Sequence, residues 1–408
     1  NIHRDSVLGA RDLNSIAINP FNPSQVFIGS YNDGMLEVND DQATVLYNHT
    51  NSGLEYPSIP GAPNYITIRI GPMTFDSQGK LWTTTARLKR PLKAYDLTSG
   101  EWQSHDFSVI LPDEINSEWG YSDVVIDNNG NKWLGGYING VIGYSENNGV
   151  PIIKTISTQE QNLPSTFVTA LAVDNRNQLW VGTISGLRVL YNTSGFFTND
   201  NPELDSIIIV EDDGVPAELM FQQYISSIEV DGSNNKWVGT YSTGLYYFTS
   251  DGQETIHHFT TDNSPLPSNN IIDISLDQNT GVLYVATDRG LLSYSSGASG
   301  TQEDLASAFV YPNPVRPTFN ITEDKIKIKD ISENVNIKIT DIEGNLVAEA
   351  QSRTNLRYKG YNLEIDGGIA YWNGKNLGNN VVASGVYLIM LTDLDSLETK
   401  VLKVMVIR

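Results

Sequence analysis

The sequence predicts an all-β protein in which a β-propeller is followed by an immunoglobulin-like β-sandwich. Three observations lead to this prediction. A β-hairpin pattern, QLWVGTISGLRVLY at residues 178–191, recurs several times up to residue 294. The recurrence stops at a Gly/Ser-rich stretch, and the last part of the chain, residues 308–408, then contains about seven short strand patterns of a different spacing.

The repeated hairpin consists of β-branched and aromatic residues with glycines at its turn. A close copy occurs at residues 236–248, clear variants occur at 132–144 and 283–294, and more divergent copies occur at 26–38 and 81–95. The central positions of the six copies are 47 to 57 residues apart and are occupied by Ile28, Trp82, Trp133, Trp180, Trp237 and Tyr284. Repeats of about 40–50 residues that each hold several strands are typical of propellers. We therefore expect six or seven blades within residues 1–294.

Within each repeat, an inner strand precedes a polar turn that begins with Asp, as at Asp127, Asp174 and Asp231. Such turns could ligate calcium, but none continues to a distal Glu as a helix-loop-helix site would. Because Asp and Asn cap their own backbone, we favour plain turns. The repeated Trp could likewise form a sugar-binding platform, but its fixed position in mid-strand favours a place in the core between blades.

Composition excludes several classes of function. The net charge of −22 argues against nucleic acid as a main partner, since no basic stripe could displace counterions from phosphates. There is no cysteine, and therefore no disulfide, thiolate nucleophile or Cys-ligated zinc. No apolar run is long enough for a membrane helix. The polar start, NIHRDSVLGARD, is not a signal peptide, and we interpret it as an internal or processed start.

Residues 295–307, SSGASGTQEDLAS, read as a linker. The domain after it, residues 308–408, has expected strands at 326–330, 335–341, 346–349, 381–391 and 399–407. The prolines of residues 309–315 place that segment at a sheet edge. Alternation puts Lys325, Lys327 and Lys329 on one face of a strand, where we favour a guard against edge pairing over a ligand site.

The repeat at Leu163–Leu187, LPSTFVTALAVDNRNQLWVGTISGL, resembles the propeller repeat of two-component-regulator sensor domains and related surface proteins. This resemblance is specific for the fold and says little about function.

The domain at 308–408 resembles the C-terminal sorting domain of the Bacteroidetes type IX secretion system, with Asn373 where that family often has Asp. The resemblance implies export through the periplasm and display at the cell surface. The motif residues that carry it are Pro312, Asn313, Pro314, Asp341, Gly344, Trp372, Gly374, Gly385, Tyr387, Lys400 and Lys403.

The domain order of this chain, a propeller followed by a sorting domain that is still attached, resembles that of the PorZ-like components of this secretion system. The resemblance implies a non-enzymatic part of the attachment complex on the extracellular face of the outer membrane, without a cofactor. Its implied partners are the sortase PorU, other attachment-complex proteins and anionic lipopolysaccharide, with no nucleic acid and no transmembrane span. The alternative is an ordinary type IX cargo, a secreted propeller adhesin or glycan-active hydrolase, whose sorting tail is still attached.

No catalytic or metal-ligating set is apparent in the sequence, because the five histidines show no metal spacing and no nucleophile motif occurs. The T-x-x-G connections should open on one face of the propeller, the usual ligand face. A basic loop replaces the connection of the second repeat, and it could contact an anionic ligand or simply be a solvated loop. The candidate binding residues are Arg87, Lys89, Arg90 and Lys93 of this loop, with Tyr31, Tyr137, Asn139, Tyr241, Ser242 and Arg289 of the connections.

Overall fold

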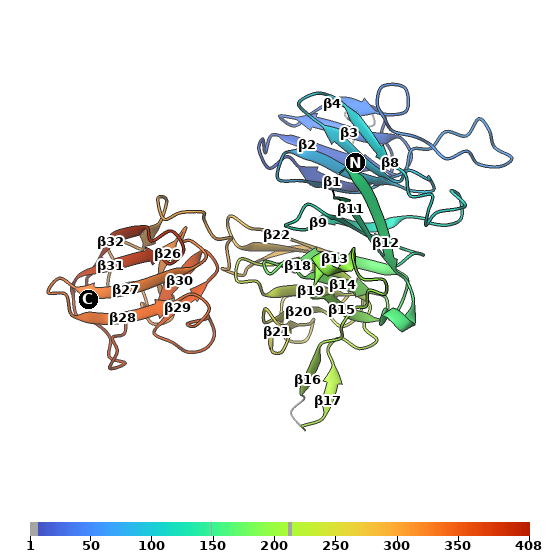
Figure 1. Cartoon of the computed structure of the whole chain (residues 1–408). Coiled ribbons are helices and arrows are strands. Elements are labelled where there is room, and N and C mark those ends of the chain that lie inside the picture. Colours follow the sequence, from blue (N-terminus) through green and yellow to red (C-terminus); the bar gives the residue numbers. More distant parts are fainter. Residues whose placement is uncertain (1–6, 148, 211–213) are drawn as a thin grey trace. The chain divides into compact units, whose positions relative to one another are not determined.

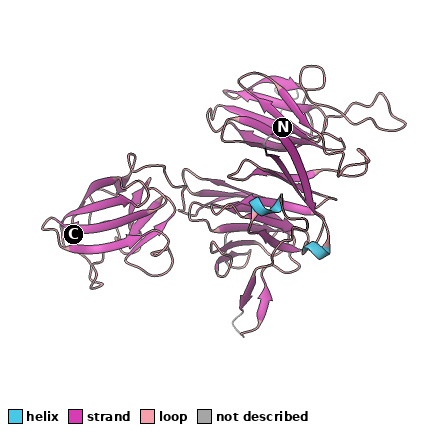
Figure 2. Ribbon diagram, in the orientation of Figure 1, coloured by secondary structure: helices cyan, strands magenta, loops and turns pink. Residues whose placement is uncertain are grey.

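The computed structural model describes residues 7–147, 149–210 and 214–408, and it confirms the all-β prediction (Figures 1 and 2). Its residues divide into two compact units. Unit 1 comprises Asn1–Ile228 and Gly239–Thr243, and unit 2 comprises Glu229–Val238 and Gly244–Arg408. The boundary runs through the fifth blade, so unit 2 holds the last part of the propeller together with the sandwich.

The propeller blades are antiparallel sheets whose strands are ordered as in the sequence. The first is β1 (Leu13–Ile18), β2 (Gln25–Ser30), β3 (Gly34–Asn39) and β4 (Gln42–Tyr47). The second is β5 (Ile70–Phe75), β6 (Lys80–Thr85), β7 (Leu92–Asp96) and β8 (Trp102–His105). The third is β9 (Tyr121–Ile126), β10 (Lys132–Gly136), β11 (Val141–Asn147) and β12 (Val150–Ile156).

The fourth blade is shorter and is followed by additional elements before the chain enters the fifth. It consists of β13 (Val168–Val173), β14 (Leu179–Thr183) and β15 (Gly186–Leu190). The short 3-10 helix η2 (Gln159–Gln161) precedes it. After it come α1 (Thr193–Phe196) and the antiparallel pair of β16 (Ile208–Val210) and β17 (Pro216–Glu218). The fifth is β18 (Ile225–Val230), β19 (Lys236–Thr240), β20 (Leu245–Phe248) and β21 (Thr255–Phe259). The sixth is β22 (Ile271–Asp277), β23 (Val282–Thr287) and β24 (Gly290–Ser295).

The repeated tryptophans form the core between blades, as predicted. Trp133 is fully buried, and its ring lies 4.8 Å from that of Phe196, which follows the fourth blade. Tyr284 differs, because 46% of its surface is exposed while Leu283 and Val285 beside it are fully buried. Side chains alternate along a strand, so in β23 the two neighbours of the repeat position pack into the core with Trp237.

The Asp turns cap their own backbone, as expected. Asp127 Oδ1 accepts the backbone N–H groups of Asn129 and Asn131, both at 2.9 Å. Its Oδ2 also accepts Trp133 Nε1 at 3.1 Å, a link that the sequence did not suggest. Asp76 and Asp174 bind Trp82 and Trp180 in the same way. One carboxylate therefore fixes both the turn and the core tryptophan of its blade.

The C-terminal domain is a sandwich of two four-stranded sheets, ordered β25-β26-β30-β29 and β28-β27-β31-β32. Its strands are β25 (Phe309–Tyr311), β26 (Ile326–Lys329), β27 (Val335–Asp341), β28 (Leu346–Gln351), β29 (Leu363–Asp366), β30 (Ile369–Trp372), β31 (Gly385–Asp393) and β32 (Thr399–Val406).

Two expectations about this part of the chain need comment. The edge-guard interpretation of the lysine row is wrong, because β26 pairs with β25 on one side and with β30 on the other. Of the stretch expected to be a linker, residues 295–307, only Ser295 belongs to a strand, β24, but the stretch is packed. Ala298 and Leu305 are fully buried, and Ser299 is 2% exposed. Among the described residues, no helix has the length and apolar character needed to span a bilayer.

Candidate functional site

One end of the propeller blades is organised by a repeated backbone hydrogen bond. The residue after the second strand donates its N–H to the carbonyl of the residue before the first strand, so both side chains emerge at the same end of the blade. The pairs of unit 1 are Tyr31 to Asp12, Ala86 to Arg69, Tyr137 to Gly120, Ile184 to Phe167 and Tyr241 to Tyr224, and the pair of unit 2 is Asp288 to Asn270. This end carries the T-x-x-G connections.

In unit 1 these paired positions carry a group of aromatic side chains that we call the aromatic rim: Tyr31, Tyr137, Phe167, Tyr224 and Tyr241. Tyr137 stacks on Phe167 with ring centroids 4.5 Å apart, and Tyr224 stacks on Tyr241 at 5.2 Å. The exposed fractions of Tyr31, Tyr224 and Tyr241 are 40%, 39% and 55%. Stacked rings that keep one face in solvent suit the apolar face of a sugar or an aromatic or proline side chain.

Two electrostatic features belong to the rim. The guanidinium of Arg69 lies 5.3 Å from the ring centroid of Tyr31 and brings one cation to the group. Burial raises the pKa of Tyr137, and the negative charge that Tyr31 and Tyr224 can acquire raises it further. Tyr31, Tyr137 and Tyr224 belong to three different blades.

Sequence reasoning missed Glu118, which shapes the connection of the third blade. Its side chain is nearly fully buried, and its carboxylate accepts the backbone N–H groups of Tyr137, Ile138 and Asn139 at 3.0 to 3.2 Å. The side chain of Asn139 is also engaged, because its Nδ2 donates to Ser117 O at 2.6 Å. Nothing in the sequence distinguishes Glu118 from the other acids. Asn139 serves this internal network, while Tyr137 lies on the rim.

Three of the four cations in the basic loop of the second blade have partners within the protein. Arg90 and Lys93 both pair with Glu55, and Lys93 Nζ also donates to Ser104 Oγ at 2.9 Å. Lys93 is fully buried, and burial lowers its pKa, an effect that Glu55 opposes. Arg87 donates from Nη1 to Ile115 O at 3.1 Å. Of the four cations, Lys89 is exposed, and no ion pair or side-chain hydrogen bond of Lys89 is seen among the described residues.

The other candidates lie at the same end of their blades. Ser242 follows Tyr241 and is exposed in unit 1, and Arg289 is exposed beside Asp288 in unit 2. Among the residues that the structure describes, no group of three or more His, Asp or Glu side chains is arranged to hold a metal ion.

The sorting-domain motif residues have structural roles within the sandwich. Asn313 donates from Nδ2 to Lys403 O and accepts Met405 N–H, which fixes the Pro312–Pro314 entry segment along β32. Asp341 caps the turn at Gly344 through the N–H groups of Glu343 and Asn345.

Trp372 is fully buried, and its ring lies 5.5 Å from that of Tyr387, whose hydroxyl donates to Ala383 O. Gly374 has a φ of +69°, a backbone conformation that favours glycine. Gly385 begins β31, Lys400 donates to Ala306 O, and Lys403 is exposed on β32.

Comparison with protein families supports both resemblances. Residues 309–366 match the secretion system C-terminal sorting domain, and residues 162–185 match the two component regulator propeller. No curated protein sequence matches the chain.

Among solved structures, PorZ, described as an essential bacterial surface component of the type IX secretion system of Porphyromonas gingivalis, is similar with a TM-score of 0.60 and 26% identity. The match covers 96% of this chain and 51% of PorZ, so the chain spans about half the length of that protein. The extracellular domain of a putative hybrid two-component system of B. thetaiotaomicron matches at a TM-score of 0.45 and 13% identity, over 99% of this chain and 56% of that one.

The order of the parts, a propeller and then a sorting domain, agrees with the sequence-based prediction. The chain is thus PorZ-like: a two-component-regulator-type β-propeller followed by a type IX secretion C-terminal sorting domain.

Proposed function

We propose that this protein is a non-enzymatic, cell-surface component of the type IX secretion attachment complex. In this role it would stand on the extracellular face of the outer membrane and bind anionic lipopolysaccharide, the sortase PorU, or both. The similarity to PorZ and the sorting domain support the assignment to this secretion system. The choice between a permanent component and a cargo depends on whether the sorting domain is built to stay attached.

The observation that carries the proposal is a partly buried hydrogen-bond network, here called the latch, that joins the sorting domain to the last blades within unit 2. Arg357 of the sandwich donates from Nη1 to Asp366 Oδ2 and to Ser296 O, both at 2.7 Å. Its guanidinium lies 4.3 Å from the ring centroid of Tyr371. Ser233 of the fifth-blade turn donates from Oγ to Asp366 Oδ1 at 2.6 Å. The two domains therefore share one hydrogen-bonded core.

The backbone between the domains is held by the same contacts. Tyr371 donates its hydroxyl to Gly297 O at 2.8 Å, and Gly368 donates its N–H to Ser299 O at 2.9 Å. A Cβ at Gly232 would lie 1.9 Å from Ser299 O, so only glycine permits this approach of the blade turn. The connecting segment is thus packed against both domains.

A packed segment resists removal of the domain that follows it. Proteases and sortases bind their substrates as extended, accessible chain, and this segment would first have to leave its contacts. These contacts would hinder the removal of a sorting tail that has to be cleaved, whereas they would stabilise a sorting domain that stays attached. The latch therefore supports a retained sorting domain and favours a component of the machinery over a cargo.

The aromatic rim and Lys89 are the surfaces that we assign to ligand or partner binding. The rim offers stacking faces and the cation of Arg69, and Lys89 offers a free ammonium group for a phosphate or carboxylate. Reversing Arg87, Lys89 and Arg90 to Glu should weaken capture of anionic lipopolysaccharide or of PorU. Since Arg87 and Arg90 have internal partners, the single variant Lys89→Glu is the matched control for folding. Unchanged binding of both partners would remove this loop from the proposal.

The decisive experiment is the intact mass of the protein purified from the surface of native cells. A mass that includes the sorting domain is expected, together with loss of surface attachment of many cargos when the gene is deleted. A mass that lacks the sorting domain, with other cargos unaffected, would favour the cargo alternative.

A further inference from the structure

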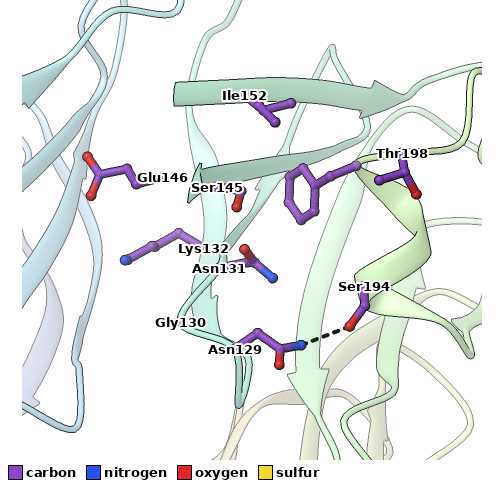
Figure 3. A pocket seen from close by; sticks show the side chains of 10 residues that line it. Asn129, Gly130, Asn131, Lys132, Ser145, Glu146, Ile152, Ser194 and Thr198 are labelled. Atoms are coloured by element: carbon purple, nitrogen blue, oxygen red, sulfur yellow. Dashed lines mark hydrogen bonds between the residues drawn. The ribbon is translucent and has the colours of Figure 1, made fainter. Parts of the chain in front are cut away.

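A pocket of about 510 Å³ lies between the third and fourth blades of unit 1, near the end of the strands opposite to the aromatic rim (Figure 3). It is formed by the turn between β9 and β10, by strands β11 and β12, and by the residues around α1. Its volume falls within the range of about 300–1,000 Å³ that is usual for small-molecule sites. None of the residues that line it belongs to the rim or to the basic loop.

The charged side chains at this pocket are turned away from it. Lys132 and Glu146 extend to the side opposite Ser194 and Thr198 (Figure 3). Lys132 Nζ lies 4.0 Å from the ring centroid of Trp82 in the second blade. Glu146 accepts the Tyr144 hydroxyl at 2.5 Å. Because side chains alternate along a strand, the side chains of Lys132 and Glu146 lie on the face of the sheet toward the second blade, and uncharged groups face the pocket.

What remains in the pocket is a set of amides and hydroxyls beside an aromatic ring: Asn129, Asn131, Ser145, Ser194, Thr198 and Phe197. Asn129 Nδ2 donates to Ser194 Oγ at 3.0 Å and so joins the two blades (Figure 3). Phe197 is half-buried, and its ring lies 5.5 Å from that of Trp133 and 5.0 Å from that of Phe196. The ring is therefore held in place by packing and does not depend on a ligand.

Ser145 faces the pocket from β11. The residue is 8% exposed and pairs across the strands with Ile152, and both residues line the pocket. Its hydroxyl can donate one hydrogen bond to a ligand and accept others from it.

We propose that this pocket binds a neutral saccharide, with Ser145 and Asn129 hydrogen-bonding its hydroxyl groups and Phe197 contacting the apolar face of its ring. Asn131 has a supporting role, because its Nδ2 donates to Asp127 Oδ2 at 2.8 Å. A sugar ring presents hydroxyls around its edge and C–H groups on its faces, which matches amides and hydroxyls beside an aromatic ring. A phosphorylated or uronate-bearing sugar would find no cation here. The inference is independent of the proposed function, because it concerns a different surface and does not require a retained sorting domain.

The test is isothermal titration of the full chain with neutral di- to hexasaccharides of glucose, mannose and galactose, and with phosphorylated or uronate forms of the same lengths. At least one neutral series should bind, and its charged form should bind more weakly. Ser145→Ala should weaken binding about 5-fold, the usual effect of losing one hydrogen bond. Ser145→Ala with Asn129→Ala should weaken it further, and the unfolding midpoint should fall only by the loss of the exposed hydrogen bond from Asn129 to Ser194.

Thr155→Val is the matched control, because it also deletes a hydroxyl from the third blade. Thr155 pairs with Ile142, on the face of the sheet that packs toward the second blade. This variant should bind as the wild type does. The proposal is wrong if no neutral saccharide binds, if the charged forms bind better, or if the Ser145 variants bind like the Thr155 control. Loss of cargo attachment or of the sorting domain in cells would leave this measurement unaffected.

Discussion

Asp127 and Asp231 occupy the same turn of two propeller blades, and the structure gives them different surroundings. Each accepts two backbone N–H groups of its own turn at 2.9 Å. Asp127 then binds Trp133 Nε1, whereas Asp231 binds the hydroxyl of Tyr247 at 2.5 Å. Asp231 also lies near Asp366 of the sorting domain. The same local motif is a plain turn in one blade and part of a domain junction in the other.

The surroundings of Asp231 have an electrostatic consequence. Burial raises the pKa of Asp231 to about 7, the charge of Asp366 raises it as well, and the hydrogen bonds from Tyr247 and the turn oppose this shift. Local sequence therefore determines the hydrogen bonds of the turn, and the tertiary neighbour determines its protonation. Four sets of substitutions test this difference.

The largest effect is expected from breaking the latch. Arg357→Ala leaves the nearly buried Asp366 without its cation and next to Asp231, which should cost about 3 kcal/mol of stability in unit 2. The connecting segment should then exchange its amide hydrogens faster and be cut sooner by added protease. Lys359→Ala is the control, since the pair of Lys359 with Glu254 is exposed and worth about 1 kcal/mol or less. Equal protection in both variants would contradict the latch.

Asp127→Ala should come next. It removes the acceptor for two backbone N–H groups and for Trp133 Nε1, and should lower the free energy of unfolding by about 2–3 kcal/mol in urea titrations. Asp231→Ala at pH 8 should cost less, because the same change also removes a repulsion with Asp366. If both alanines cost the same at pH 8, the two turns are energetically equivalent and the comparison fails.

The pH dependence sharpens the comparison. Because the pKa of Asp231 rises from 3.8 to about 7, the folded state binds the proton more tightly than the unfolded state. The stability that this group contributes is present below about pH 4 and is lost as the pH rises through about 7. Relative to Asp231→Asn, the wild type should therefore lose stability over this window. Asp127→Asn serves as the control, and parallel curves for wild type and Asp231→Asn would refute the assignment.

The smallest effect concerns the two tryptophans. Trp133 Nε1 donates to Asp127, whereas Trp237 Nε1 is buried and has no partner among the described residues. Both rings are fully buried, so replacement by Phe leaves a similar cavity in each case. Trp133→Phe should therefore cost about 1 kcal/mol more than Trp237→Phe. Unfolding curves of the two variants measure the difference, and an equal cost would mean that the Asp–Trp bond contributes nothing.

Much of the fold could be read from the sequence because its signals are local and repeated. The hairpins, the Asp turns and the Trp strands recur with one spacing, and the motif residues of the sandwich occur in order. The positions of Tyr31, Tyr137 and Tyr241 on one end of the blades follow from the same repeat. The site was less predictable: Glu118 resembles every other acid in a chain with 48 of them, and the internal partner of Lys93, Glu55, is 38 residues away.

By itself, the sequence determined the class of each domain, the order of the two domains and the end of each blade at which its connections emerge, because these depend on strand periodicity and turn chemistry. Only the tertiary structure decided which charges are neutralised, which side chains line a pocket, and that the segment between the domains is packed. The physical reason is that hydrogen bonding and burial of a side chain depend on neighbours that are distant in the chain. Arg357 and Ser296, 61 residues apart, meet only in the folded protein.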